Sequence, residues 1–185
     1  MNGAERVRAD RRMHTRAFEH HHESSGIIGA PIHQVFTFID DPARLAGHMT
    51  RSSWMMGGGR MQVQMDNARG QRTGSRIVMT GRAFGFELEL EEIIDERTPP
   101  MRKAWHTVGA PSLVVMGSYR MGCDLAPEGD ATRLRVFIDY GLPERQAWLG
   151  RICGRWYARW CTQRMLSDCR RHFARGEGTL ASATI

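Results

Sequence analysis

The spacing of apolar residues changes along this chain, and the order of the changes restricts the fold more than any other feature. From about residue 60 to residue 140, apolar and polar residues alternate with a period of two, which is typical of strands with one wet face. The clearest run is FELELE at 86–91, where every second residue is a glutamate. From about residue 143 a broad apolar stripe at helical spacing replaces the alternation. We therefore predict six consecutive antiparallel strands followed by one long helix.

Two shorter patterns precede these strands. Residues 18–28 mix polar and β-compatible side chains and predict a first strand. The run IHQVFTFI at 32–39 has apolar residues at i, i+3, i+4 and i+7 after Pro31, and Asp41 can cap a second short helix that ends near Met49. The expected order is β-α-α-β6-α, an α+β fold in which the long helix lies across a curved antiparallel sheet.

The composition is that of one globular domain. The chain has 185 residues, of which 41% are hydrophobic and 25% charged. We expect a domain over residues 17–175, a flexible Arg-rich arm over 1–16 and a disordered tail over 176–185. No segment reaches the roughly 18 to 20 apolar residues of a membrane span, and arginines occupy the place of a signal peptide's apolar stretch, so we expect a cytoplasmic protein.

The net charge of +6 invites a nucleic-acid interpretation. The excess arginines are divided between residues 1–16 and 142–175, which weakens that interpretation, and we expect no nucleic-acid partner. Lys103 is the only lysine among 26 basic residues, a skew that suggests a bacterial source with GC-rich DNA.

Arginines also recur along the expected final helix, where Arg151, Arg155 and Arg159 stand at i, i+4 and i+8. Such a row is usually a solvated face. The alternative is transient contact with an anionic membrane, because tryptophans lie nearby in the sequence.

No motif for metal, phosphate or nucleophile chemistry is visible. The four cysteines lack CxxC spacing, and they are expected to be reduced thiols. In the run His20-His21-His22, alternate residues of a strand face opposite ways, so at most two imidazoles converge. We expect no metal and no cofactor, and no catalytic residue can be assigned.

Three stretches carry a resemblance to a known superfamily: APIHQVFTFIDDP at 30–42, LAPEGDATRL at 125–134 and the Trp-rich final helix. With the element order, they resemble the START-like, polyketide cyclase/dehydrase-type SRPBCC superfamily over roughly residues 17–173. The resemblance implies a helix-grip architecture, in which a curved sheet wraps around the C-terminal helix and encloses a hydrophobic cavity. Members bind lipids, sterols, polyketides or other apolar molecules, and only some are enzymes.

The inward faces of the strands and the helix supply the expected cavity wall. Its members are Met79, Phe86, Trp105, Tyr119, Met121, Tyr140, Trp156 and Trp160. The expected rim residues are His48, Arg82 and Lys103. Tyr119 and Tyr140 are the most informative, because a buried phenol seeks a hydrogen-bond partner and can offer one to a ligand. The alternative is that these side chains pack as a solid core.

Three functions follow from this interpretation. The first is binding, transport or sequestration of a small hydrophobic ligand such as a lipid or a polyketide-like aromatic. The second is a polyketide cyclase/dehydrase-type enzyme, in which Tyr119, Tyr140 or a rim histidine polarises a carbonyl group. The third is an interaction module whose apolar groove receives a partner protein. The oligomeric state, monomer or homodimer, stays open.

Overall fold

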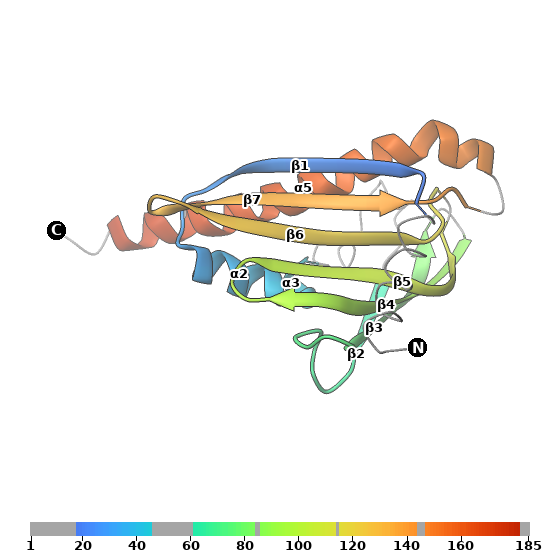
Figure 1. Ribbon diagram of the computed structural model, residues 1–185, viewed down its shortest axis with the longest axis horizontal. Coiled ribbons are helices and arrows are strands. Elements are labelled where there is room, and N and C mark those ends of the chain that lie inside the picture. Colours follow the sequence, from blue (N-terminus) through green and yellow to red (C-terminus); the bar gives the residue numbers. More distant parts are fainter. Residues whose placement is uncertain (1–17, 46–60, 84–85, 114, 144–146, 182–185) are drawn as a thin grey trace, which may run out of the picture.

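A computed structural model describes most of the chain as one sheet with helices on one side (Figure 1). The described residues are 18–45, 61–83, 86–113, 115–143 and 147–181. The elements are β1 (His20–Ile28), α2 (Ile32–Asp40), α3 (Pro42–Leu45), β2 (Met61–Met65), β3 (Arg76–Ala83), β4 (Phe86–Thr98), β5 (Arg102–Ser112), β6 (Tyr119–Glu128), β7 (Ala131–Tyr140) and α5 (Ala147–Ala181). This order confirms the predicted α+β arrangement.

The sheet has seven strands in the order β1-β7-β6-β5-β4-β3-β2, and every pair is antiparallel. Strands β2 to β7 form a meander, since each is hydrogen-bonded to the strand that follows it in the sequence. Strand β1 forms one edge of the sheet and pairs with β7, with His20 opposite Tyr140 and Ile28 opposite Thr132. The two ends of the domain sequence therefore meet at one edge.

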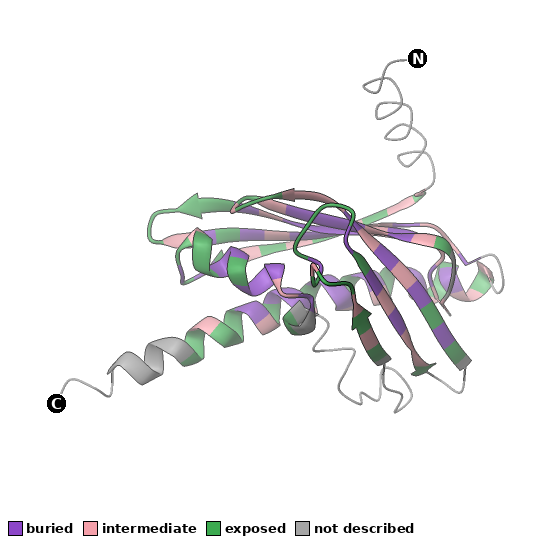
Figure 2. Cartoon of the chain, turned by 90° about the horizontal axis from the view of Figure 1, so that it is seen from below, coloured by how far each residue is buried: buried purple, intermediate pink, exposed green. Residues whose placement is uncertain are grey.

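Helices α2 and α5 cover the same face of the sheet, which we call the inner face (Figure 2). Helix α5 contacts β1, β7 and α2. The Ser24 and Thr162 hydroxyls are hydrogen-bonded at 2.9 Å between β1 and α5. The Phe38 ring of α2 lies 4.7 Å from that of His172 and 6.1 Å from that of Phe173 on α5. The main core lies between the helices and the inner face.

Two glycines bring the first half of α5 close to the end of the sheet. A Cβ on Gly150 would lie 2.6 Å from Cδ of Pro143, and a Cβ on Gly154 would lie 3.2 Å from Cε2 of Tyr140. Both positions also face the backbone oxygen of Val115, at 3.2 and 3.3 Å. The absence of side chains at these two positions sets which side of the helix faces the sheet.

A bulge in β4 changes which residues face inward. Ile94 pairs with Trp105 and Glu96 pairs with Ala104, so Asp95 is an extra residue between two ladder positions. Ion pairs place both Asp95 and Glu96 on the outer face. The inward positions of β4 are even-numbered before the bulge, and Arg97 contacts the inner side after it.

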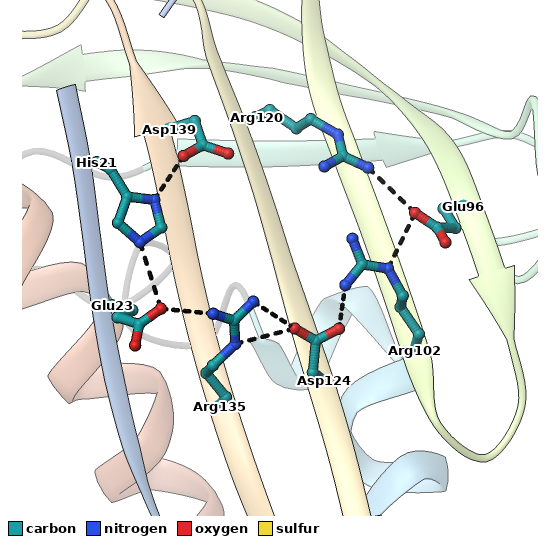
Figure 3. Close-up of polar contacts among 8 residues, drawn as sticks. All are labelled: His21, Glu23, Glu96, Arg102, Arg120, Asp124, Arg135 and Asp139. Carbon is teal, nitrogen blue, oxygen red and sulfur yellow. Dashed lines mark hydrogen bonds and ion pairs between the residues drawn. The ribbon is translucent and has the colours of Figure 1, made fainter. Parts of the chain in front are cut away.

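The outer face carries a continuous chain of polar contacts that crosses the sheet from β1 to β4 (Figure 3). Its links are His21–Asp139 (2.6 Å), His21–Glu23 (3.3 Å), Glu23–Arg135 (2.5 Å), Arg135–Asp124 (2.8 Å), Asp124–Arg102, Arg102–Glu96 (2.9 Å) and Arg120–Glu96 (3.2 Å). Acidic and basic groups alternate along most of it. We call it the outer ion chain.

Phe137 lies beneath the outer ion chain and is only 3% exposed, although its side chain is on the outer face. The guanidinium carbons of Arg102, Arg120 and Arg135 lie 5.4, 5.8 and 5.4 Å from the centre of its ring. The facing residue on β6 is Gly122, where a Cβ would lie 2.6 Å from the ring. Gly122 therefore makes the space that the Phe137 ring fills.

The ends of the predicted domain are only partly described. Helix α5 continues to Ala181, past Gly176, where the sequence predicts a disordered tail. The predicted arm over 1–16 and residues 182–185 lie outside the described residues. None of the described helices is both long enough and apolar enough to cross a membrane.

Candidate ligand-binding site on the inner face

Five of the eight expected wall residues are buried on the inner face of the sheet. They are Met79, Trp105, Tyr119, Met121 and Tyr140. All five belong to one apolar cluster with the buried side of α5. Trp105 and Met121 are direct cross-strand neighbours, as are Tyr119 and Tyr140. The period-two pattern therefore places these side chains on the side that the resemblance requires.

The helix contributes differently from the expectation. Trp156 is 55% exposed and does not line the inner face, which corrects its assignment to the wall. The apolar stripe of α5 is broad enough to include more than one side of the helix, and the contacts of Gly150 and Gly154 turn Trp156 outward. Trp160 is half-buried against the core, with its ring 5.7 Å from that of Tyr157. The side chain of Phe86 lies outside the described residues.

The expected rim residues also lie differently. Arg82 is exposed and pairs with Glu87 at 3.0 Å on the wet side of the sheet. His48 lies outside the described residues. Lys103 is 1% exposed, so it is an interior residue and not part of a rim.

Lys103 is held by the C-terminal end of α2. Its Nζ donates to the backbone oxygen of Asp40 at 2.8 Å and to Oδ1 of Asp40 at 3.0 Å. Arg97 donates from Nε and Nη2 to the same carboxylate at 3.0 and 2.8 Å. Burial lowers the pKa of Lys103, whereas the bonds from Arg97 and Lys103 lower the pKa of Asp40 against the opposing effect of burial. This closed cluster anchors α2 on β4 and β5.

The inner face also holds a carboxyl group that the interpretation of the sequence missed. Glu92 is buried and lies in phase with Leu88 and Leu90, whereas Glu89 and Glu91 face the other way. The alternation of β4 continues through Glu92 to Ile94. Continuing the period-two alternation past Leu90 predicts that Glu92 faces the interior.

Glu92 is surrounded by hydrogen-bond donors of the inner face. The Tyr119 hydroxyl donates to Oε1 of Glu92, and the side chain of Trp105 is also hydrogen-bonded to the carboxyl group. Burial raises the pKa of Glu92 to about 7, although both hydrogen bonds favour the carboxylate. Burial and the neighbouring carboxyl likewise hold the pKa of Tyr119 well above its ordinary value. Glu92 thus exchanges a proton near neutral pH, inside an apolar layer.

The Tyr119 side chain is positioned from both layers. Its backbone N–H donates to Oγ1 of Thr107 at 3.0 Å, at the point where the ladder between β5 and β6 ends. On the helix side it faces Tyr157 and Cys161, which are hydrogen-bonded to each other. Glu92, Trp105 and Tyr119, which we call the inner polar cluster, therefore lie on the sheet beneath α5.

The described residues contain no group of three or more His, Cys, Asp or Glu side chains that could hold a metal ion. His20 and His22 face inward from β1, while His21 faces Asp139 on the outer face. The Asp139 hydrogen bond raises the pKa of His21. Cys123, Cys161 and Cys169 are buried free thiols. Among the described residues, the inner polar cluster supplies hydrogen-bond donors and one carboxyl group with a raised pKa.

Comparison with known proteins identifies the architecture. No protein-family model matches this chain, and no curated protein does. Solved structures do match: CV1439 from Chromobacterium violaceum is 19% identical with a TM-score of 0.56, covering 83% of this chain and 96% of its own. TTHA0849 from Thermus thermophilus is 14% identical with a TM-score of 0.58, covering 85% and 99%. Ara h 8.0201 is 11% identical with a TM-score of 0.57, covering 84% and 98%.

This chain has a helix-grip fold. The likeness extends over nearly the whole length of each of these three structures and includes the sheet and the long C-terminal helix. At these low identities, the shared property is the fold.

Proposed function

We propose that this protein binds a small, largely apolar molecule between the inner face of the sheet and α5, and so transports or sequesters it. The observation that supports this most is the inner polar cluster, in which a carboxyl group, a phenol and an indole lie together among apolar side chains. Small-molecule sites are built in this way, from an apolar wall with a few polar groups that orient the ligand. The helix-grip fold supports the same proposal.

The protonation of Glu92 indicates the ligand chemistry. Below a pH of about 7, Glu92 is neutral and accepts hydrogen bonds from Tyr119 and Trp105 on its oxygens. Its own proton then remains available to donate. A ligand that presents a carbonyl oxygen to this proton satisfies the cluster, as a polyketide-like aromatic or the carbonyl end of a lipid would. Above this pH the carboxylate repels an anionic ligand.

Tryptophan emission during a titration with a flavonoid and with a fatty acid tests the proposal. Trp105 belongs to the cluster, so a ligand that reaches Glu92 changes its surroundings. We expect a saturable change that is stronger below the Glu92 pKa of about 7 than above it. Trp148→Phe leaves the response intact, because Trp148 is exposed on α5.

Two variants separate the cluster from general effects. Glu92→Gln removes the pH dependence of the binding constant, whereas the matched variant Glu91→Gln retains it, because Glu91 faces Arg76 on the other side of β4. Tyr119→Phe weakens binding by about 0.5 to 1.5 kcal/mol if its hydroxyl contacts the ligand. A broad apolar panel that changes no emission, together with a stable complex with another protein, contradicts ligand binding and favours the interaction module.

A polyketide cyclase/dehydrase-type enzyme is the second candidate, and the pKa of Glu92 is the observation that favours it. A general acid or base works best with a pKa near the operating pH, and Glu92 has a pKa of about 7. Here Glu92 exchanges a proton with a ligand carbonyl or its α-carbon, and Tyr119 positions the carboxyl group. Turnover of a poly-β-carbonyl thioester that Glu92→Gln abolishes, while binding persists, would support the enzyme over the binding protein.

A further inference from the structure

The first half of α5 exposes a row of large apolar side chains. Trp148 is 64% exposed, Ile152 is 68% exposed and Trp156 is 55% exposed. They stand at i, i+4 and i+8, so they lie on one side of the helix. The opposite side packs on the sheet through Gly150 and Gly154. Neighbouring large apolar side chains exposed on a helix are the kind of surface that marks an interaction site.

Basic residues share this exposed side. Arg151, Arg155 and Arg159 also stand at i, i+4 and i+8, and all three are exposed between the apolar positions. The sequence contains no Asp or Glu from residue 147 to residue 167. The ion pairs described within α5 lie in its second half, where Asp168 pairs with Arg164 and Arg171. The exposed face is therefore both apolar and positively charged.

We propose that this face of α5 docks on an anionic lipid bilayer. Tryptophan and isoleucine side chains fit the boundary between headgroups and acyl chains, and arginines fit lipid phosphates. Juxtaposed basic residues add attraction to anionic lipid. Since the other side of α5 is held on the sheet, the helix lies flat on the surface and stays part of the domain. This proposal does not depend on the identity of a ligand.

The charge distribution favours a membrane over other partners. A second copy of the chain, related by a twofold axis, would bring two arginine rows together without carboxylates between them. Nucleic acid offers phosphates to the arginines but no apolar layer for Ile152 and the two tryptophans. An anionic bilayer offers both in one surface.

Vesicle co-sedimentation of the full chain tests the proposal. The probes are phosphatidylcholine vesicles and phosphatidylcholine vesicles that contain one-third phosphatidylglycerol. We expect binding to the anionic vesicles, at least tenfold weaker binding to the neutral ones, and a loss of binding at high salt. Brominated lipids should quench tryptophan emission, and Trp148→Phe with Trp156→Phe should remove most of that quenching.

Matched variants separate this face from the overall charge. Arg151→Glu with Arg155→Glu should weaken vesicle binding at least tenfold, as should Trp148→Ser with Trp156→Ser. Arg72→Glu with Arg133→Glu makes the same change in net charge at exposed positions away from α5 and should retain binding. Circular dichroism melting verifies that each variant is folded. Quenching by brominated lipids in the unmodified chain tests the proposal even if a variant fails to fold.

The proposal would be overturned by no binding to anionic vesicles, by equal losses in the α5 and control variants, or by protein self-association that Trp148→Ser abolishes while vesicles remain unbound. Binding of duplex DNA in preference to vesicles would also overturn it.

Discussion

Two buried or partly buried carboxyl groups of the same strand, three residues apart, have pKa shifts in opposite directions. Glu92 faces the inner side of β4, where burial raises its pKa to about 7. Asp95 faces the outer side, where burial also acts to raise its pKa, but the neighbouring His106 and the Arg120 guanidinium, which donates at 2.8 Å, hold the pKa below its ordinary value. The Arg120 guanidinium beside Asp95, in place of the neutral donors beside Glu92, reverses the direction in which burial alone would shift the pKa.

The buried ion pairs of the inner face are formed by Asp40 with Lys103 and Arg97. Lys103 and Asp40 are both buried, and with Arg97 they satisfy one another. Glu92 has neutral donors as its hydrogen-bond partners, so it keeps its proton to a higher pH. The inner face thus contains an ion-pair cluster at Asp40 and a buried carboxyl group with a raised pKa at Glu92, whereas the outer ion chain is charged and partly solvated.

The largest expected loss of stability comes from removing the carboxylate that Lys103 and Arg97 share. Asp40→Asn removes the carboxylate from buried Lys103 and should lower the free energy of unfolding by about 3 to 5 kcal/mol. Denaturant unfolding measures the change. Asp41→Asn, at the adjacent half-exposed position, is the control and should cost about 0.5 kcal/mol or less.

Adding Lys103→Met to Asp40→Asn should recover part of the lost stability, since it removes the uncompensated ammonium. Equal costs for Asp40→Asn and Asp41→Asn would show that the cluster does not anchor α2.

The second prediction is a gain in the free energy of unfolding, not a loss. The pKa of Glu92 is raised in the folded state from 4.5 to about 7, so its stabilising contribution is complete below about 4.5 and is lost as the pH rises through about 7. Glu92→Gln should remove this dependence and raise the free energy of unfolding above that pH by about 3 kcal/mol. Unfolding at a series of pH values measures it.

Glu91→Gln is the matched control and should retain the pH dependence of the unmodified chain. A Glu92→Gln variant whose stability still falls between these two pH values would show that another group titrates there.

A smaller loss is expected on the outer face. Gly122→Ala places a Cβ 2.6 Å from the Phe137 ring and 2.8 Å from the backbone oxygen of Lys103. Overpacking of this kind should lower the free energy of unfolding by about 2 kcal/mol. Ser25→Ala, on the outer side of β1, is the control for a small exposed strand position. Similar thermal melting of the two variants would contradict the described Phe137 packing.

The smallest effect should come from one link of the outer ion chain. Asp124 joins Arg102 to Arg135, and all three side chains are partly exposed. Asp124→Asn should cost about 1 kcal/mol or less at low salt, and the difference should shrink as salt screens the charges. A loss that is independent of salt would mean that Asp124 contributes through packing.

Local periodicity was enough to predict the strands and the faces of most of them. The alternation in β4, β5, β6 and β7 follows directly from the backbone geometry of a strand, and it placed Trp105, Tyr119 and Met121 inside without reference to other elements. Glu92 obeys the same rule. It was missed because the apolar members of the run ended at Leu90, not because its placement needed the structure.

The remaining assignments depended on contacts between distant parts of the chain. Lys103 is interior because Asp40, at the end of α2, pairs with it. Trp156 is exposed because Gly150 and Gly154 turn α5 against the sheet. The sequence alone determined the order of the elements and the alternation within each strand, since both arise from neighbouring residues. Which side of the long helix is covered, and which charge finds a partner, was decided only by the tertiary structure, because burial and pairing are properties of segments brought together by folding.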